Sequence, residues 1–174
     1  LSLIHFDAHT DTHEGPVLNH GSMFAYAAKE GLIDAKTSVQ MGIRTIIPAG
    51  DDFTVLTADK CLELGSKAIV AKVREVVGDR PCYISLDVDG MDPAYAPGTG
   101  TPVPGGITSA MQREILWGLA GLNAVGGDVV EVSPPYDPSH ITSILGATIG
   151  MDILYVLAEA PIRSKLRAKA AAAV

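Results

Sequence analysis

The sequence predicts an α/β protein in which a mostly parallel sheet lies between layers of helices. Strand-like runs alternate with helix-like runs along the 174 residues, an order typical of parallel sheets with helical crossovers. Hydrophobic residues make up 47% of the chain, enough for one sizeable core. Because no repeat or linker divides it, we expect residues 1–162 to form one domain and residues 163–174 a short Ala/Lys/Arg tail.

The first half of the chain is expected to supply three strands and two helices. Short runs rich in apolar and β-branched residues predict the strands, which are Ser2–Asp7, Val39–Ile43 and Phe53–Leu56. Between the first two, Ser22–Glu30 is expected to be helical, with Gly31 ending the helix in a left-handed conformation. Ala58–Val77 is long enough for a second helix, and Gly65 marks its point of interruption.

The second half repeats the alternation. Two apolar runs predict strands, of which Cys82–Val88 is expected to be buried and Val125–Val132 is the other. Between them, Ser109 and Gln112 have the spacing of a capping box, which predicts a helix from there to about Leu122. The apolar stretch Ser139–Glu159 is expected to form the last helix.

Charge and composition narrow the classes of partner. The formal net charge of −7 argues against nucleic acid and anionic membranes as partners, and suits a cationic ligand. We find no run long and apolar enough to span a bilayer, so we expect no membrane partner. Cys61 and Cys82 lack the spacing of a metal site, and we expect both to be reduced and structural, as in the cytoplasm.

The first cluster of chemically capable residues is Asp7, His9 and Asp11. In a straight strand, residues four apart would be separated by roughly 13 Å, so the chain must curl where the strand ends if all three are to meet. Ligands of open α/β sheets bind at such carboxyl ends. The pattern fits half of a metal site, and it also fits a strand-end turn with solvated aspartates.

The second cluster, Asp87 and Asp89, follows another apolar strand, and Glu131 lies at the end of a third. Buried carboxylates are unfavourable unless they are paired or bind metal, although two aspartates capping backbone amides remain the alternative. Four carboxylates and one imidazole suit two Mn²⁺ ions. The glycine-rich stretch Pro97–Pro102 lacks the ending of a phosphate loop, and its glycines are expected to let backbone pass close to the site.

Several separated blocks resemble the arginase/agmatinase (ureohydrolase) family. These blocks are Phe6–Asp11, Asn19–Phe24, Ser85–Pro93, Pro97–Pro102 and Glu131–Asp137, and the likeness runs from Leu1 to about Glu159. The resemblance implies an arginase-like three-layer α/β/α fold with a binuclear Mn²⁺ centre. It also implies that residues 1–162 are the C-terminal portion of a ureohydrolase domain, truncated at the N-terminus. Trimeric or hexameric homo-oligomers are expected on the same basis.

The resemblance also implies a role for each site residue. Asp7 and Asp87 would bridge the two ions, His9 and Asp89 would bind one ion, and Asp11 would bind the other and orient the nucleophile. Glu131 would pair with the substrate guanidinium, and His20 would transfer protons. The family's Gly-Gly-Asp-His block, whose His completes the ligand set, has no match here, and His5 lies too early in its block to replace it.

Substrate choice is the remaining question. The segment before His20, His13–Asn19, does not match the arginase segment that reads an amino-acid head group, whereas Ala94–Pro97 resembles agmatinases. We therefore expect hydrolysis of agmatine to putrescine and urea by a cytoplasmic enzyme, or a mitochondrial one if the source is eukaryotic. The alternatives are a guanidinobutyrase or guanidinopropionase, an inactive metal-binding fragment and, less favoured, a nucleotide-binding domain.

Overall fold

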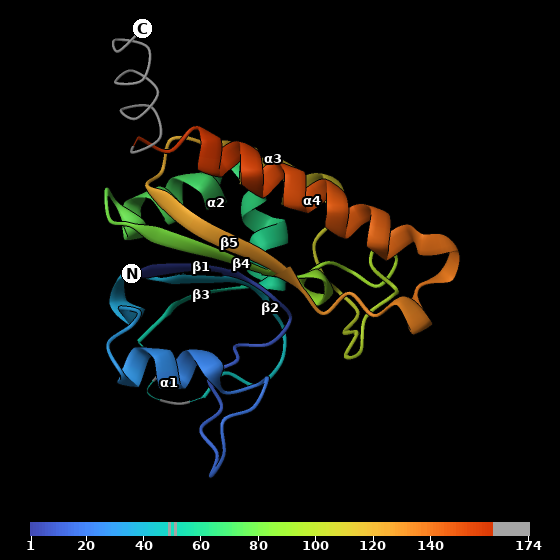
Figure 1. Cartoon of the computed structure of the whole chain (residues 1–174), viewed down its shortest axis with the longest axis horizontal. Helices are drawn as coiled ribbons and strands as arrows, with labels where there is room; N and C mark the ends of the chain where they lie inside the picture. Colours follow the sequence, from blue (N-terminus) through green and yellow to red (C-terminus); the bar gives the residue numbers. More distant parts are fainter. Residues whose placement is uncertain (49, 51, 162–174) are drawn as a thin grey trace, which may run out of the picture.

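The computed structural model describes residues 1–48, 50 and 52–161, and its centre is one five-stranded sheet (Figure 1). Each pair of neighbouring strands is parallel, and their order across the sheet is β3-β2-β1-β4-β5. The strands are β1 (Ser2–Phe6), β2 (Val39–Ile43), β3 (Thr54–Thr57), β4 (Cys82–Asp87) and β5 (Ala124–Val130). This order puts β1 in the middle, between β2 and β4. The expected tail, residues 163–174, lies outside the described residues.

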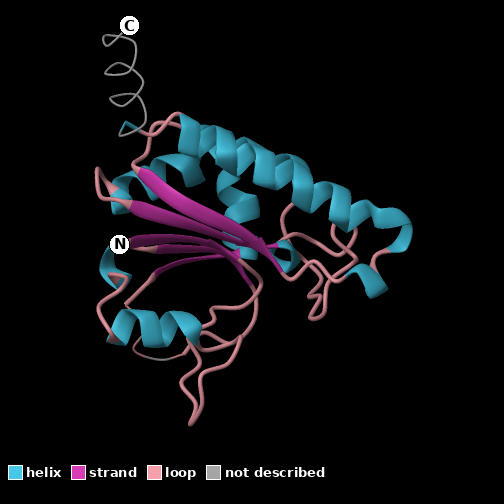
Figure 2. Cartoon of the chain, viewed as in Figure 1, coloured by secondary structure: helices cyan, strands magenta, loops and turns pink. Residues whose placement is uncertain are grey.

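Helices cover both faces of the sheet, as Figures 1 and 2 show. One face carries α1 (Met23–Lys29), and the other carries α2 (Ala58–Val77), α3 (Ser109–Gly118) and α4 (Ile141–Ala158). Helix α2 packs on β2 and β3, α4 packs on β5, and α3 lies against both helices. The predicted three-layer α/β/α architecture with a parallel sheet is therefore confirmed.

Side-chain alternation along β1 and β4 separates an apolar face from a polar one. Ile4 and Phe6 point into the core beneath α2, α3 and α4, together with Ile84 and Leu86. The residues between them face the α1 side, and there His5 pairs in register with Gln40 on β2 and Ser85 on β4. The polar row therefore crosses the middle of the sheet and includes His5, the next-to-last residue of β1.

Helix α4 corrects the expectation that no segment could span a bilayer. Pro138–Ala158 meets the length and composition of a span, with a mean hydropathy of 1.7. Its buried residues recur every three or four positions, as Thr142, Gly146, Ile149, Ile153 and Val156, and this stripe packs on β5 and α3. Asp152 in the same helix accepts hydrogen bonds from Arg113 and Trp117. One side of this apolar helix thus packs against the sheet layer.

Two helix boundaries differ from the sequence prediction in detail. Helix α3 is capped by Thr108, whose hydroxyl accepts from the Met111 N–H at 3.0 Å, so the cap is one residue earlier than the expected Ser109. The helix also stops at Gly118, before Leu122. The interruption of α2 at Gly65 is confirmed by its left-handed φ of 73°.

Candidate metal centre

Three strand ends supply the residues of the candidate site. β1, β4 and β5 run parallel side by side, so their carboxyl ends meet at one edge of the sheet. A pocket of about 280 Å³ opens there. It is lined by Asp7, His9, Asp11, His13, His20, Gly21, Met23, Asp87, Thr101, Val130 and Glu131. A larger pocket of about 780 Å³ lies at α1 and contains none of the five proposed metal ligands, so size alone would not identify the site.

The chain curls immediately after β1, as the spacing of the first cluster requires. Asp7 Oδ1 accepts the backbone N–H of His9 at 2.6 Å, an Asx-type turn that reverses the strand direction. Asp11 has a left-handed φ of 53°, which turns the chain again. These two turns bring Asp7, His9 and Asp11 around one pocket instead of leaving them spread along a strand.

A short 3₁₀ turn, η2 (Val88–Gly90), presents the second cluster. Asp87 Oδ1 accepts the Asp89 N–H at 2.8 Å, and Asp89 Oδ1 accepts the Ala8 N–H from the β1 turn at 3.0 Å. A Cβ on Gly90 would lie 2.8 Å from the Asp7 nitrogen, so only glycine lets the two turns pack this closely. Both aspartates thus cap backbone amides, and Asp89 also joins the two clusters.

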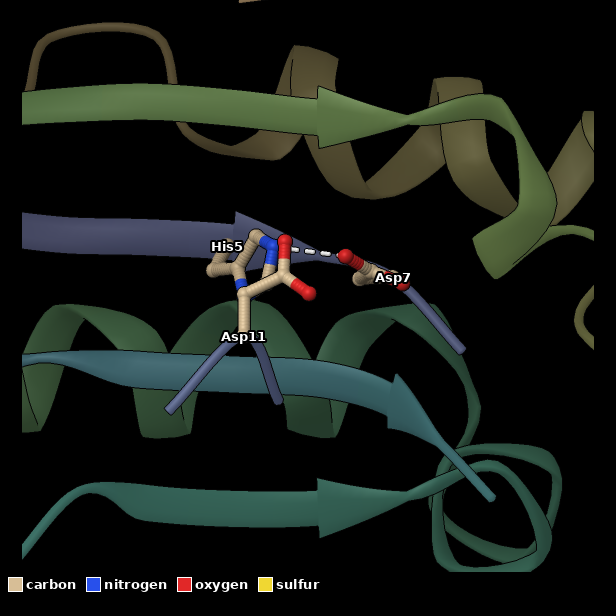
Figure 3. A group of neighbouring side chains, drawn as sticks. All are labelled: His5, Asp7 and Asp11. Carbon is tan, nitrogen blue, oxygen red and sulfur yellow. Dashed lines mark ion pairs between the residues drawn. The ribbon is translucent and has the colours of Figure 1, made fainter. Parts of the chain in front are cut away.

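Two overlapping groups of side chains have the geometry to hold a cation. Ligand atoms of Asp7, His9 and Asp89 lie within 4.8 Å of one another, and so do those of His5, Asp7 and Asp11. Figure 3 shows the second group, with His5 and the Asp11 carboxylate close to Asp7 at the end of β1. Both groups share Asp7, so adjacent cation positions would have this carboxylate in common.

The crowding of carboxylates disturbs their ionisation. Burial, reinforced by the negative charge of Asp7, raises the pKa of Asp11 to about 8. Burial and the charges of Asp7 and Asp89 raise the pKa of Asp87 to about 9. Without a cation, these two carboxyls therefore hold protons at neutral pH, and a divalent ion would displace them. The clustered carboxyls therefore fit a metal centre, because a divalent ion would neutralise the charges that crowd there.

Asp7 and His9 are shifted in the opposite sense, toward their charged forms. Hydrogen bonds to Asp7 and Asp89 raise the pKa of His9 to about 10. Burial acts to raise the pKa of Asp7, but hydrogen bonds from His5 and His9 outweigh it, so that pKa lies well below its usual value. An imidazolium between two carboxylates occupies the place where a cation would be most favourable.

Glu131 and His20 lie at the mouth of the pocket and are both exposed. Glu131 is the first residue after β5 and has a left-handed φ of 62°. The glycine-rich loop passes beside it, since a Cβ on Gly100 would be 3.7 Å from Glu131 Oε2. His20 comes from the loop between β1 and α1. The structure therefore gathers these two residues with Asp7, His9, Asp11 and Asp87, while Asp89 lies buried beneath them.

Three further residues bear on the site and were not assigned roles from the sequence. Thr101 donates its hydroxyl to Asp89 Oδ2 at 3.0 Å. His5 Nε2 lies 3.0 Å from Asp7 Oδ2 (Figure 3), and Arg44 donates to the carbonyl of Asp89 at 2.6 Å. For His5 the signal was its place two residues before Asp7, since such residues share a strand face.

Comparison with known proteins identifies the family. The Arginase family model matches residues 1–155. An agmatinase of Escherichia coli O7:K1 is 50% identical over 159 residues, which cover 91% of this chain and 52% of that protein.

Solved structures agree. A hypothetical agmatinase from Burkholderia thailandensis has a TM-score of 0.87 at 51% identity, covering 90% of this chain and 50% of that one. The proclavaminate amidino hydrolase of Streptomyces clavuligerus has a TM-score of 0.86 at 44% identity, covering 91% and 56%. The chain thus spans about half the length of its relatives, and it belongs to the arginase family.

Proposed function

We propose that this chain carries the metal-binding part of a ureohydrolase that cleaves agmatine to putrescine and urea. The observation that carries the proposal is the meeting of three strand ends at one pocket, where four aspartates and His9 gather below Glu131. The identity of 50% to an agmatinase over 91% of the chain supports the same reaction.

We propose two Mn²⁺ ions as the cofactor, which Asp7, His9, Asp11, Asp87 and Asp89 would hold. Carboxylate-rich sites with few imidazoles suit Mn²⁺ better than Zn²⁺. When bound, such a pair supplies Lewis acidity and a water molecule that ionises near neutral pH. In this proposal Asp11 also orients that nucleophile toward the guanidinium carbon.

The substrate would be held by Glu131. A carboxylate accepts two parallel hydrogen bonds from a guanidinium, and Glu131 stands at the pocket mouth. Fixing the cationic group in one pose makes the attack effectively unimolecular. As the bond from the central carbon to the chain nitrogen breaks, the leaving amine needs a proton. We assign its delivery to His20, whose exposure gives it access to solvent protons.

A guanidino substrate with a carboxylate tail is the second candidate. One solved relative at 44% identity is a proclavaminate amidino hydrolase. A carboxylate tail would favour a Lys or Arg near the pocket. Within the described part of the chain, the residues that line the pocket include neither. This favours agmatine over guanidinobutyrate and guanidinopropionate.

The test is urea release by the full-length protein, with and without Mn²⁺, from agmatine, guanidinobutyrate, guanidinopropionate and arginine. Agmatine is expected to have the highest kcat/KM, and Asp89→Asn is the metal-site control that should abolish turnover. If a carboxylate-tailed compound is turned over as fast as agmatine or faster, that compound would take the place of agmatine as the proposed substrate. If the Mn²⁺-loaded protein releases no urea from any of these substrates, the alternative of an inactive metal-binding protein would be favoured.

We also propose a cytoplasmic enzyme that forms homo-oligomers. The bacterial agmatinase relatives support the location, and so does the finding that Cys61 and Cys82 are free thiols in the buried interior. The oligomer rests on the family resemblance, and light scattering of the full-length protein would test for the expected trimer or hexamer.

A further inference from the structure

A chain of buried polar side chains leads from β2 to the candidate metal centre. His5 and Gln40 are paired on neighbouring strands, and both are almost completely inaccessible to solvent, at 1% and 0% exposure. His5 Nε2 contacts Asp7 Oδ2 at 3.0 Å (Figure 3). The Gln40 side-chain nitrogen lies 3.2 Å from His5 Nδ1 and donates to the Thr10 carbonyl at 2.6 Å.

The Thr10 carbonyl determines the direction of every hydrogen bond in this chain. A carbonyl only accepts, so the group of Gln40 that faces it must be the NH₂ end. The same NH₂ also faces His5 Nδ1, which must then accept. In a neutral imidazole the proton is therefore on Nε2, and that N–H points at Asp7 Oδ2. The donor His5 thus has a fixed tautomer.

The hydrogen bond from His5 completes a clamp on the Asp7 carboxylate. Its other oxygen, Oδ1, accepts the His9 backbone N–H at 2.6 Å. The His9 ring nitrogen also lies 3.2 Å from Oδ1. Because each oxygen has a donor, rotation of the carboxylate about its last side-chain bond would break these hydrogen bonds. The ring of His5 is itself fixed by an edge contact with Phe24, at 4.6 Å between centroids. Asp7 is therefore oriented before any ion arrives.

We propose that His5 and Gln40 are positioning residues that hold Asp7 in its ligand orientation, without binding metal themselves. This inference rests on the proposed metal centre. Both ring nitrogens of His5 already have partners in Asp7 and Gln40, so a ligand role would require breaking one of these contacts. Donors to ligating carboxylates raise metal affinity by orienting the ligand, and losing one typically weakens binding by about 10–100-fold.

The first test measures Mn²⁺ affinity and stoichiometry in the full-length protein by calorimetric titration. His5→Phe keeps a flat ring against Phe24 and removes the donor, so the Mn²⁺ Kd should rise about 10–100-fold, with the number of bound ions at saturation unchanged. His5→Gln returns an N–H of similar reach and should recover most of the affinity. Ser85→Ala is the matched control, because Ser85 neighbours His5 on the sheet but donates to Asp128.

The second test asks whether Gln40 acts through His5. Gln40→Leu should also weaken Mn²⁺ binding, and it should have little further effect when His5→Phe is already present. Such non-additivity distinguishes a relay from two independent packing defects. If His5→Phe does not fold, Gln40→Leu alone still tests the proposal.

Two results would overturn the inference. Loss of one bound ion at saturation in His5→Phe would make His5 a ligand, and unchanged Mn²⁺ affinity in both single variants would make the contacts merely structural. The readout is independent of turnover. If Mn²⁺ affinity depends on His5 but the protein releases no urea, this inference stands and the proposed function is wrong.

Discussion

At the scale of single residues, the pocket is bordered by two backbone conformations that side chains rarely adopt. Asp11 and Glu131 both have left-handed φ values, 53° and 62°. A non-glycine residue in this region is strained, and such residues cluster at functional sites because the surrounding structure holds them there. At Glu131 the conformation ends β5 abruptly and leaves the carboxylate at the pocket mouth.

Replacing Glu131 by Gln should destroy most turnover while the metals remain bound. An amide cannot accept both hydrogen bonds of a guanidinium, so kcat/KM for agmatine should fall by at least about 100-fold, or about 3 kcal/mol. Metal content should not change, because the five proposed ligands are untouched. Glu159→Gln, remote and exposed, is the control. Wild-type turnover would make Glu131 structural, whereas loss of metal would place it among the ligands.

The raised pKa values of Asp11 and Asp87, about 8 and 9, predict a pH dependence. Their folded-state pKa values exceed the unfolded value, so they stabilise the metal-free fold fully below about pH 4, and this contribution is lost as pH rises toward 8–9. Mn²⁺ displaces the same protons, so its stabilising effect should grow over that range.

The measurement is thermal unfolding with chelator and with Mn²⁺ at several values between about pH 6 and pH 8.5. The Mn²⁺-induced increase in Tm should become larger as pH rises. Asp11→Asn and Asp87→Asn should each flatten this trend, because the amide does not titrate. A Tm increase that is constant across the range would contradict the prediction.

The residues that end strands were the easiest candidates to single out from the sequence. Asp7, His9, Asp11, Asp87 and Glu131 could be named because charged residues directly after apolar strands are unusual, and the structure places all five around one pocket. His5 was set aside as a ligand because it lies too early in its block to replace the missing family His. The positioning role proposed for it depends on a register with Gln40, 35 residues away in the sequence, which no local pattern reveals.

At the scale of elements, the Arg44 side chain holds together the loops around the site through hydrogen bonds. Arg44 follows β2 and donates to backbone carbonyls on three separate segments. Its acceptors are Gly42, Asp89, Gly90, Met91 and Val103. A planar guanidinium can serve several carbonyls at once because its five N–H groups have fixed directions.

Arg44→Lys should therefore loosen the turn that holds Asp89. An ammonium group cannot reach the same set of carbonyls, and lost hydrogen bonds to a charged group should lower the free energy of unfolding by about 2 kcal/mol or more. Mn²⁺ affinity should fall with it. Urea unfolding and metal titration check both effects. Arg74→Lys is the control, because Arg74 forks to carbonyls on the exposed surface and should change stability much less. If both variants lose the same stability and Mn²⁺ affinity, Arg44 has no particular role in holding the site loops.

Element boundaries show where local pattern stops being decisive. The alternation of strands and helices was predictable because each run has the period or length of its type. The start of α3 was misplaced by one residue because Thr108 and Ser109 both offer hydroxyls, and tertiary packing selects Thr108 as the cap. The order of strands across the sheet could not be read from the sequence, since nothing local specifies that β1 lies between β2 and β4.

At the scale of the whole molecule, two surfaces remain open. β5 forms one edge of the described sheet, and an edge strand presents unpaired backbone groups. Beside it, α4 leaves several large apolar side chains outside the core, namely Ile141, Ile144, Met151, Leu154 and Tyr155. The relatives have about twice the length of this chain.

Produced alone, the 174-residue chain should self-associate through these surfaces. Ile144 and Leu154 are 64% and 57% exposed, and large apolar side chains left exposed on one helix favour association. Ile144→Lys with Leu154→Lys should shift the chain toward monomer in size-exclusion chromatography with light scattering. Leu62→Lys adds a charge at an isolated exposed position on α2 and should not. Monomeric wild-type chain would refute the prediction.

The central place of β1 also sets the timing of folding. Ala8 and Asp89, which join the two halves of the candidate centre, are separated by 81 residues in sequence. At roughly 5–20 residues per second, a ribosome needs roughly 4–16 seconds to synthesise that stretch. During this interval the first strand lacks its β4 neighbour, and such non-local pairings form late. A metal ion bound there therefore could not template the early steps, and the buried side chains of β1 must be kept from aggregating until β4 has been made.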